Sequence, residues 1–180
     1  MRCRTSPVVP VFVPVLVLLL AGCAGTAPKP EFVRPLAEDS IIDANDKVAV
    51  VVAASPGVVL QPTEKQRLTD LVAQQIAAMQ AANAAGDERS YRVEVDLTRY
   101  DKGNALARAM LAGLGQIHID ARVTLLHGES GEQLSVFKIE KTFAWGGVYG
   151  GVTGIEDVEP AFAAAIAATV TATAEPPAAQ

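Results

Sequence analysis

Two stretches of strict alternation between apolar and polar residues constrain the fold of this chain most. In residues 91–98 every second side chain is apolar and those between are charged or carry a hydroxyl, and residues 117–125 repeat the pattern. Because successive side chains of a β-strand point to opposite faces, this period of two predicts strands with one buried and one solvated face. The chain therefore needs a second layer to cover the apolar face.

Two further segments are typical of strands. Residues 133–144 follow 117–126 across a short turn that contains Gly128 and Gly131, and this spacing predicts an antiparallel hairpin. Residues 47–53 are apolar on both faces. That pattern predicts a strand that is covered on both sides or is central in its sheet, with Val50 in the core.

Two amphipathic helices supply the second layer. The first is expected to begin with a capping box from Thr63 to Gln66 and to end before Gly86, and the second follows residue 157. Their apolar stripes recur at helical spacing and comprise Leu68, Leu71, Val72, Ile76 and Met79 in the first helix and Val158, Phe162, Ile166 and Val170 in the second.

The predicted order is β-α-β-β-β-α, which favours an α/β (α+β) two-layer sandwich, a mixed sheet with two helices on one face. A right-handed crossover sets strand 47–53 parallel to strand 91–100. At 180 residues the chain suits a single α/β domain, placed at residues 47–173, with a disordered tail over 174–180.

Residues 1–22 have the parts of a secretory signal peptide: Arg2 and Arg4, an apolar stretch and small residues at its end. Prolines inside the stretch make it a poor transmembrane helix. It ends in Leu20-Ala21-Gly22-Cys23, which resembles the lipobox of bacterial lipoproteins. This resemblance implies a lipid on Cys23 that anchors the chain in a membrane. Ala24, in place of an Asp, implies the outer membrane and its periplasmic face.

Residues 23–46 are predicted to be the lipidated cysteine and a tether. Pro28, Pro30 and Pro35 would interrupt any helix, and no apolar period is visible, although Phe32, Val33 and Leu36 could rest on the domain. Fully extended, such a tether would span roughly 70 Å and let the body stand off the membrane.

The body also resembles a known family. A valine-rich first strand, the sequence Leu97-Thr98-Arg99-Tyr100, a Gly103-Asn-Ala-Leu-Ala-Arg108 segment, a hairpin, a Gly-Gly segment and an alanine-rich last helix are similar to small bacterial lipoproteins with domain of unknown function 4410. The resemblance covers residues 47 to about 172. It implies a compartment and a fold type, and it supplies no catalytic residues.

Composition and spacing favour a protein without catalysis. The net charge of −5 argues against nucleic acid as a partner, because its binders need a basic face. His118 and His127 lie too far apart on one strand and its exit to share a metal ion unaided, and no serine stands in a Gly-x-Ser-x-Gly elbow. We expect no catalytic residue, no metal and no cofactor.

Two glycine-rich stretches remain. Residues 146–154 are predicted to be a flexible crossover to the last helix; the acidic residues that follow would repel a phosphate. Residues 103–115 are either a short packed helix or an exposed contact patch. The apolar side chains of that patch would be Leu106, Met110, Leu111 and Leu114.

Loops at the carboxyl ends of the predicted strands gather at one edge of the sheet, the usual place for a site, and the tether enters at the opposite edge. The candidate binding surface consists of Arg99, Tyr100, Lys102, Arg108, Trp145 and Tyr149. We therefore predict a membrane-anchored, periplasm-facing binding or accessory module with an envelope protein as partner. The alternative is a small-ligand or lipid carrier, with a pocket between the glycine-rich loops and the sheet.

Overall fold

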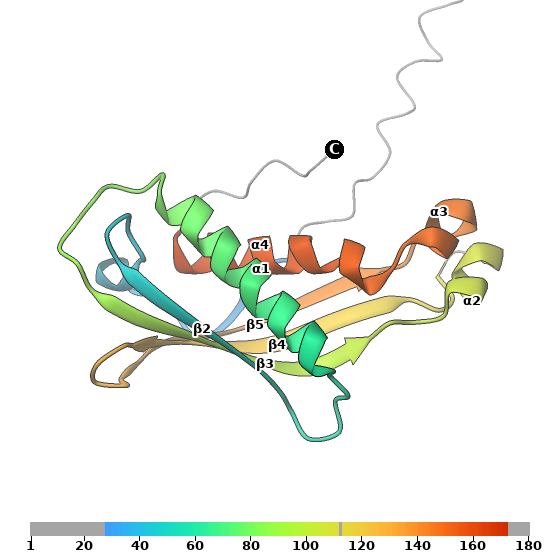
Figure 1. The fold of residues 1–180 in the computed structure, drawn as a ribbon, viewed down its shortest axis with the longest axis horizontal. Coiled ribbons are helices and arrows are strands. Elements are labelled where there is room, and N and C mark those ends of the chain that lie inside the picture. The colour runs from blue at the N-terminus through green and yellow to red at the C-terminus, as the bar shows by residue number, and fades with distance from the viewer. Residues whose placement is uncertain (1–27, 112, 173–180) are drawn as a thin grey trace, which may run out of the picture.

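The computed structural model describes residues 28–111 and 113–172. Its elements are β1 (Glu31–Arg34), η2 (Glu38–Ser40), β2 (Lys47–Ala54), α1 (Pro62–Gln80), β3 (Ser90–Asp101), α2 (Ala105–Met110), β4 (Ile117–His127), β5 (Gln133–Phe143), α3 (Gly147–Val152), η3 (Ile155–Asp157) and α4 (Glu159–Val170). The strands form one sheet in the order β1-β5-β4-β3-β2, and α1 and α4 lie over one of its faces (Figure 1). The predicted mixed α+β class is confirmed.

The strand pairings also agree with the prediction. β2 runs parallel to β3, from Lys47 opposite Ser90 to Ala54 opposite Leu97. β4 is antiparallel both to β3 and to β5, so the predicted hairpin is present. The parallel pair is joined through α1, and the other two pairs are joined through shorter connections.

The core lies between the sheet and the two long helices. The apolar residues of the alternating strands face the helices, and both predicted stripes are buried except Leu71, which is half-buried. Helix α1 starts earlier than predicted: Pro62 is its first residue, and the carboxylate of Glu64 accepts a hydrogen bond from the Gln61 amide at 2.9 Å. The predicted cap at Thr63 is therefore wrong by two positions.

Strand β2 is an edge strand, which corrects the prediction that it is central or doubly covered. Only Val52 is fully buried; Val50 is half-buried on the helix side, and Val51 is 45% exposed on the bare face of the sheet. A continuous apolar run fits a buried strand and an edge strand of small apolar residues equally well, so the pattern could not separate them.

The predicted tether is partly built into the fold. Residues 31–34 form β1, which pairs antiparallel with β5, and the Phe32 ring lies 5.7 Å from the Phe137 ring. Ile42 is fully buried. The sheet thus begins at Glu31, before the predicted domain start at residue 47, because a four-residue edge strand is too short to show a period.

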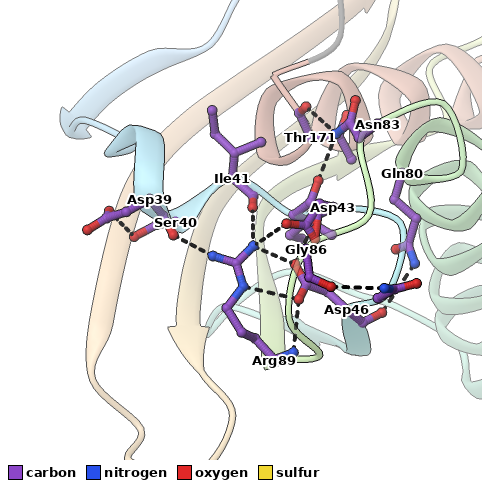
Figure 2. A network of polar contacts seen from close by, with 12 residues as sticks. Asp39, Ser40, Ile41, Asp43, Asp46, Gln80, Asn83, Gly86, Arg89 and Thr171 are labelled. Atoms are coloured by element: carbon purple, nitrogen blue, oxygen red, sulfur yellow. Dashed lines mark hydrogen bonds and ion pairs between the residues drawn. The ribbon is translucent and has the colours of Figure 1, made fainter.

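Arg89 fixes the segment after β1 to the start of β3 (Figure 2). Its guanidinium lies 2.9 Å from carboxylate oxygens of both Asp43 and Asp46, and it donates hydrogen bonds to the carbonyls of Asp39 and Ile41. The Asn83 amide joins the same segment to the end of α4 through the carbonyls of Ile42 and Thr171 (Figure 2). This network holds the segment after β1 and the end of α4 against α1 and β3.

The two carboxylates of this network differ in their ionisation. Burial opposes ionisation of Asp46, but hydrogen bonds from Arg89 and from the Asp43 amide outweigh it and lower the Asp46 pKa. Burial and the neighbouring Asp46 charge raise the pKa of Asp43. The Asp43 Oδ1 atom is buried without a hydrogen-bond partner among the described residues, which agrees with that direction.

Candidate binding surface

Two short helices, α2 and α3, pack together at one end of the molecule (Figure 1). The first follows β3 and the second follows β5, so both stand where these strands end. The Gly113 amide donates a hydrogen bond to the Ala144 carbonyl at 3.1 Å and links the exit of α2 to the exit of β5. The connections after β3 and β5 thus meet at one tip, as predicted.

Local sequence explains why these short helices form. The Asn104 side chain caps α2 by accepting a hydrogen bond from the Ala107 amide at 2.9 Å. Gly103 has a φ of +63°, and a Cβ at this position would collide with the Gly115 carbonyl. Glycine is required here because no other residue could bring the two ends of this loop so close.

Arg108 holds the tip together from inside. Its side chain is 2% exposed, although it was predicted to be on the surface. Its guanidinium donates hydrogen bonds to the carbonyls of Gly150 at 2.8 Å, Gly115 at 2.6 Å and Thr153 at 2.8 Å, with a longer bond to Lys102. The planar fork of five N–H donors suits this cage of carbonyls, so Arg108 positions the tip.

The outer side of the tip is a hydrophobic surface, here called the tip patch. Its members are Leu106, Met110, Leu111, Leu114, Trp145, Val148, Tyr149 and Val152, each at least 45% exposed. The Tyr149 ring lies 5.9 Å from both the Trp145 and the Phe143 rings. Such a concentration of exposed apolar side chains at one end of a molecule marks an interaction site more often than ordinary surface.

The structure separates the six residues of the predicted surface. Trp145 and Tyr149 lie in the tip patch. Arg99 and Lys102 are partly exposed at its base, and they form ion pairs with Asp101 at 3.4 Å and Glu64 at 2.5 Å. Tyr100 and Arg108 are buried, so their placement on the surface was wrong.

Tyr100 belongs to a buried network beneath α1 and α4. Its hydroxyl donates a hydrogen bond of 2.6 Å to the Glu159 carboxylate, which also accepts two bonds from Arg67 at 2.6 and 2.9 Å. Burial, and then the bond to Glu159, raise the pKa of Tyr100; the same carboxylate raises the pKa of Arg67. Glu159 is the first residue of α4, and its fully buried carboxylate binds Arg67 and Tyr100 and makes no capping hydrogen bond to the helix.

The two alternatives for residues 103–115 both hold in part. Residues 105–110 form the packed helix α2, which faces α3 through Arg108 and Ala109. Leu106, Met110, Leu111 and Leu114 are exposed, as the contact-patch alternative required. Sequence reasoning missed Val148 and Val152, because α3 is a single helical turn and a half inside a glycine-rich stretch that predicts a flexible crossover.

Two further findings concern chemistry and membranes. Within residues 28–111 and 113–172, no three His, Cys, Asp or Glu side chains lie close enough together to hold a metal ion. No helix in that part of the chain is long and apolar enough to cross a membrane.

The fold and the tip define a small two-layer α+β protein with an exposed apolar end. Residues 64–147 match the family model of a domain of unknown function, DUF4410. The resemblance drawn from the sequence is thus confirmed, over the span from the first turn of α1 to the start of α3. A search among curated proteins finds no match.

Solved structures with a similar fold include the PelC dodecamer from Paraburkholderia phytofirmans. It is 12% identical to this chain, with a TM-score of 0.51, and the match covers 80% of this chain and 98% of that one. A variant of it is 13% identical, with a TM-score of 0.52, and the match covers 79% of this chain and 97% of that one. A minor lipoprotein from Acinetobacter baumannii is 13% identical, with a TM-score of 0.43 over 77% of this chain and 94% of that one. At these identities the likeness to PelC shows the fold alone.

Proposed function

We propose that this chain is a lipoprotein of the cell envelope, anchored through Cys23 at the periplasmic face of the outer membrane, and that its tip patch binds another envelope component without catalysis. The observation that carries the proposal is the tip itself. Buried Arg108 is committed to shaping two short helices whose outer side chains are apolar and exposed. Contact between so much apolar surface and water is unfavourable in free energy, and a partner that covers the surface removes this penalty.

The anchor rests on the sequence. Leu20-Ala21-Gly22-Cys23 follows an apolar stretch with Arg2 and Arg4 ahead of it, and Ala24 follows the cysteine. Those residues lie outside the described part of the chain. The match of residues 64–147 to DUF4410 supports the proposal, because the sequence resemblance to this family is a resemblance to small bacterial lipoproteins.

The chemistry of the tip supports binding over catalysis. Its side chains are aliphatic, aromatic or thioether groups, and the polar groups next to them already have partners. Arg108 donates to backbone carbonyls, and Lys102 is paired with Glu64. Aromatic side chains with apolar neighbours are typical of contact surfaces.

The alternative of a ligand carrier has less support. A groove of about 450 Å³ lies between the N-terminal segment and α4 and is lined by Phe32, Leu36 and Ala168, among others. It is open to solvent and lies away from the glycine-rich loops where the carrier pocket was expected. A carrier needs a pocket that encloses most of its ligand.

Two experiments in cells test the proposal. Cys23→Ala should leave an unlipidated precursor that no longer fractionates with the outer membrane, since the cysteine sulfur accepts the diacylglycerol. A photo-cross-linking amino acid at position 148 should form adducts with an envelope component, and the same amino acid at position 51, on the bare sheet face, should not. An acylated Cys23→Ala chain would contradict the anchor, and equal adducts at both positions would contradict the tip as the binding surface.

A further inference from the structure

The direction of β1 shows from which side the chain enters the body. β1 is antiparallel to β5, with Glu31 opposite Lys138 and Arg34 opposite Val136. Since β5 runs from Lys138 towards Phe143 and the tip, β1 runs away from the tip. The residues before Glu31 therefore approach from the side of the tip, which corrects the prediction that the tether enters at the opposite edge.

Chain length then limits how far the anchor can lie from the tip. Cys23 stands eight positions before Glu31, so at no more than about 3.6 Å per residue Cys23 lies within about 29 Å of Glu31. Phe143, whose ring contacts Tyr149 of the tip patch, is five residues beyond Lys138, or about 17 Å along the strand. A lipid on Cys23 can thus reach the level of the tip patch, and the predicted 70 Å of free tether does not exist.

The tip patch has the composition of a surface that inserts into a lipid interface. Val148 and Val152 on α3 and Met110 on α2 are 84%, 75% and 74% exposed. Trp145 and Tyr149 stand next to them, and these are the residue types that settle at the boundary between headgroups and acyl chains. The one charged side chain within α2 and α3, Arg108, is buried and turned inward, so insertion would not drag a charge into hydrocarbon.

We propose that the tip patch inserts into the interfacial layer of the same bilayer that holds the lipid on Cys23. This inference rests on the proposed anchor, and it names the lipid surface as the envelope component that the tip binds. The anchor keeps the patch within reach of the bilayer, so lipid is the apolar medium that the patch meets first. Insertion of the patch adds a second membrane contact to that of the diacylglycerol on Cys23, and membrane binding strengthens with the apolar area buried. Together they also fix the orientation of the body, with the strand ends of β3 and β5 towards the membrane.

The single tryptophan of the chain provides the test, because Trp145 lies in the patch. The full lipidated protein is reconstituted into vesicles of phosphatidylethanolamine and phosphatidylglycerol, with or without bromine on the phospholipid acyl chains. We expect bromine to reduce Trp145 fluorescence at least twofold, with a blue-shifted emission in both vesicle types. High salt should not reverse the effect, since the contact is apolar.

Matched variants separate the patch from the anchor. Val148→Asp combined with Val152→Asp should abolish the quenching while the protein still floats with the vesicles through its lipid. Val51→Asp places the same charge on the bare sheet face and should leave the quenching unchanged. Both mutated positions of the patch are more than 70% exposed, so the thermal midpoint should stay near that of the wild type; Val148→Ser with Val152→Ser serves as a milder pair.

The outcomes are distinguishable. A wild-type protein that floats with the vesicles but keeps its Trp145 fluorescence in brominated lipid would overturn the inference and leave the anchor intact. A blue shift that appears only as the protein oligomerises would assign the patch to a second copy of the chain and overturn it as well. A lipidated protein that does not float would contradict the anchor, and with it both proposals.

Discussion

The Nε atom of Arg108 donates a hydrogen bond to the Gly150 carbonyl at 2.8 Å, and this contact joins α2 to α3 across 42 residues of sequence. The rest of the guanidinium is bonded to carbonyls on both sides of the same junction. The geometry of the tip patch therefore depends on a side chain that contributes almost nothing to its surface. The sequence shows Arg108 as a lone cation in an apolar segment, which predicts a surface contact.

Arg108→Ala is expected to lower the free energy of unfolding by at least about 2 kcal/mol, because it leaves several buried carbonyls without donors. Urea unfolding of the purified protein measures this loss, and amide exchange should increase first in α2 and α3. Arg108→Lys is the matched control and should recover only part of the loss, since one ammonium group cannot span the same carbonyls. An alanine variant as stable as the wild type would contradict the positioning role.

Trp145→Ala is expected to cost less than about 1 kcal/mol of stability, because the indole is 45% exposed and its ring contact is with another patch residue, Tyr149. A tryptophan that plugged the end of the sheet would cost about 3–5 kcal/mol when truncated. Thermal or urea unfolding followed by far-UV circular dichroism decides between these values. Phe162→Ala, in the buried stripe of α4, is the control that should show the large loss.

Because β2 lies at the edge of the sheet, the same substitution should affect stability differently at neighbouring positions of this strand. Val52→Asp should destabilise the fold by several kcal/mol, because the charge would be buried against α1, whereas Val51→Asp on the bare face should change stability by about 1 kcal/mol or less. Val50→Asp should fall between them, since Val50 is half-buried. Equal losses at positions 51 and 52 would mean that both faces of β2 are covered in solution.

The network around Arg89 predicts a loss of stability in acid. The folded-state pKa of Asp46 is lowered, so its contribution to stability is present above the unfolded pKa of about 4 and is lost as the pH falls through the folded value. Asp46→Asn should therefore lower stability at pH 7 and flatten the decline below about pH 4. Urea midpoints from pH 2 to pH 7 measure both effects.

Asp43→Asn is the control for that measurement. The pKa of Asp43 is raised in the folded state, so ionisation of this group lowers the stability of the fold. The contribution of Asp43 to stability therefore becomes more favourable as the pH falls and the group is protonated. The asparagine variant should keep the acid-induced decline and should lose less stability at neutral pH than Asp46→Asn. If Asp43→Asn lost more stability at neutral pH than Asp46→Asn, the pKa directions assigned to these two carboxylates would have to be exchanged.

The sequence by itself determined the strands, the long helices and the layer that they form. Alternation in residues 91–98 and 117–125, and the helical stripes that contain Leu68 and Phe162, are local patterns repeated often enough to predict which face of each element is buried. The hairpin and the parallel pairing followed from connection lengths and the handedness of the crossover. The residues typical of DUF4410 were likewise visible in the sequence.

Only the tertiary structure decided the place of each element at the edge and the tip. β1 is too short to have a period, β2 looks the same at an edge as at the centre, and Tyr100 and Arg108 are buried by groups far away in the sequence. Glu159 reaches Tyr100 across 59 residues, and Gly150 reaches Arg108 across 42. Whether a polar side chain faces water or a buried partner depends on what the fold brings beside it, and a local pattern carries no information about a partner that distant.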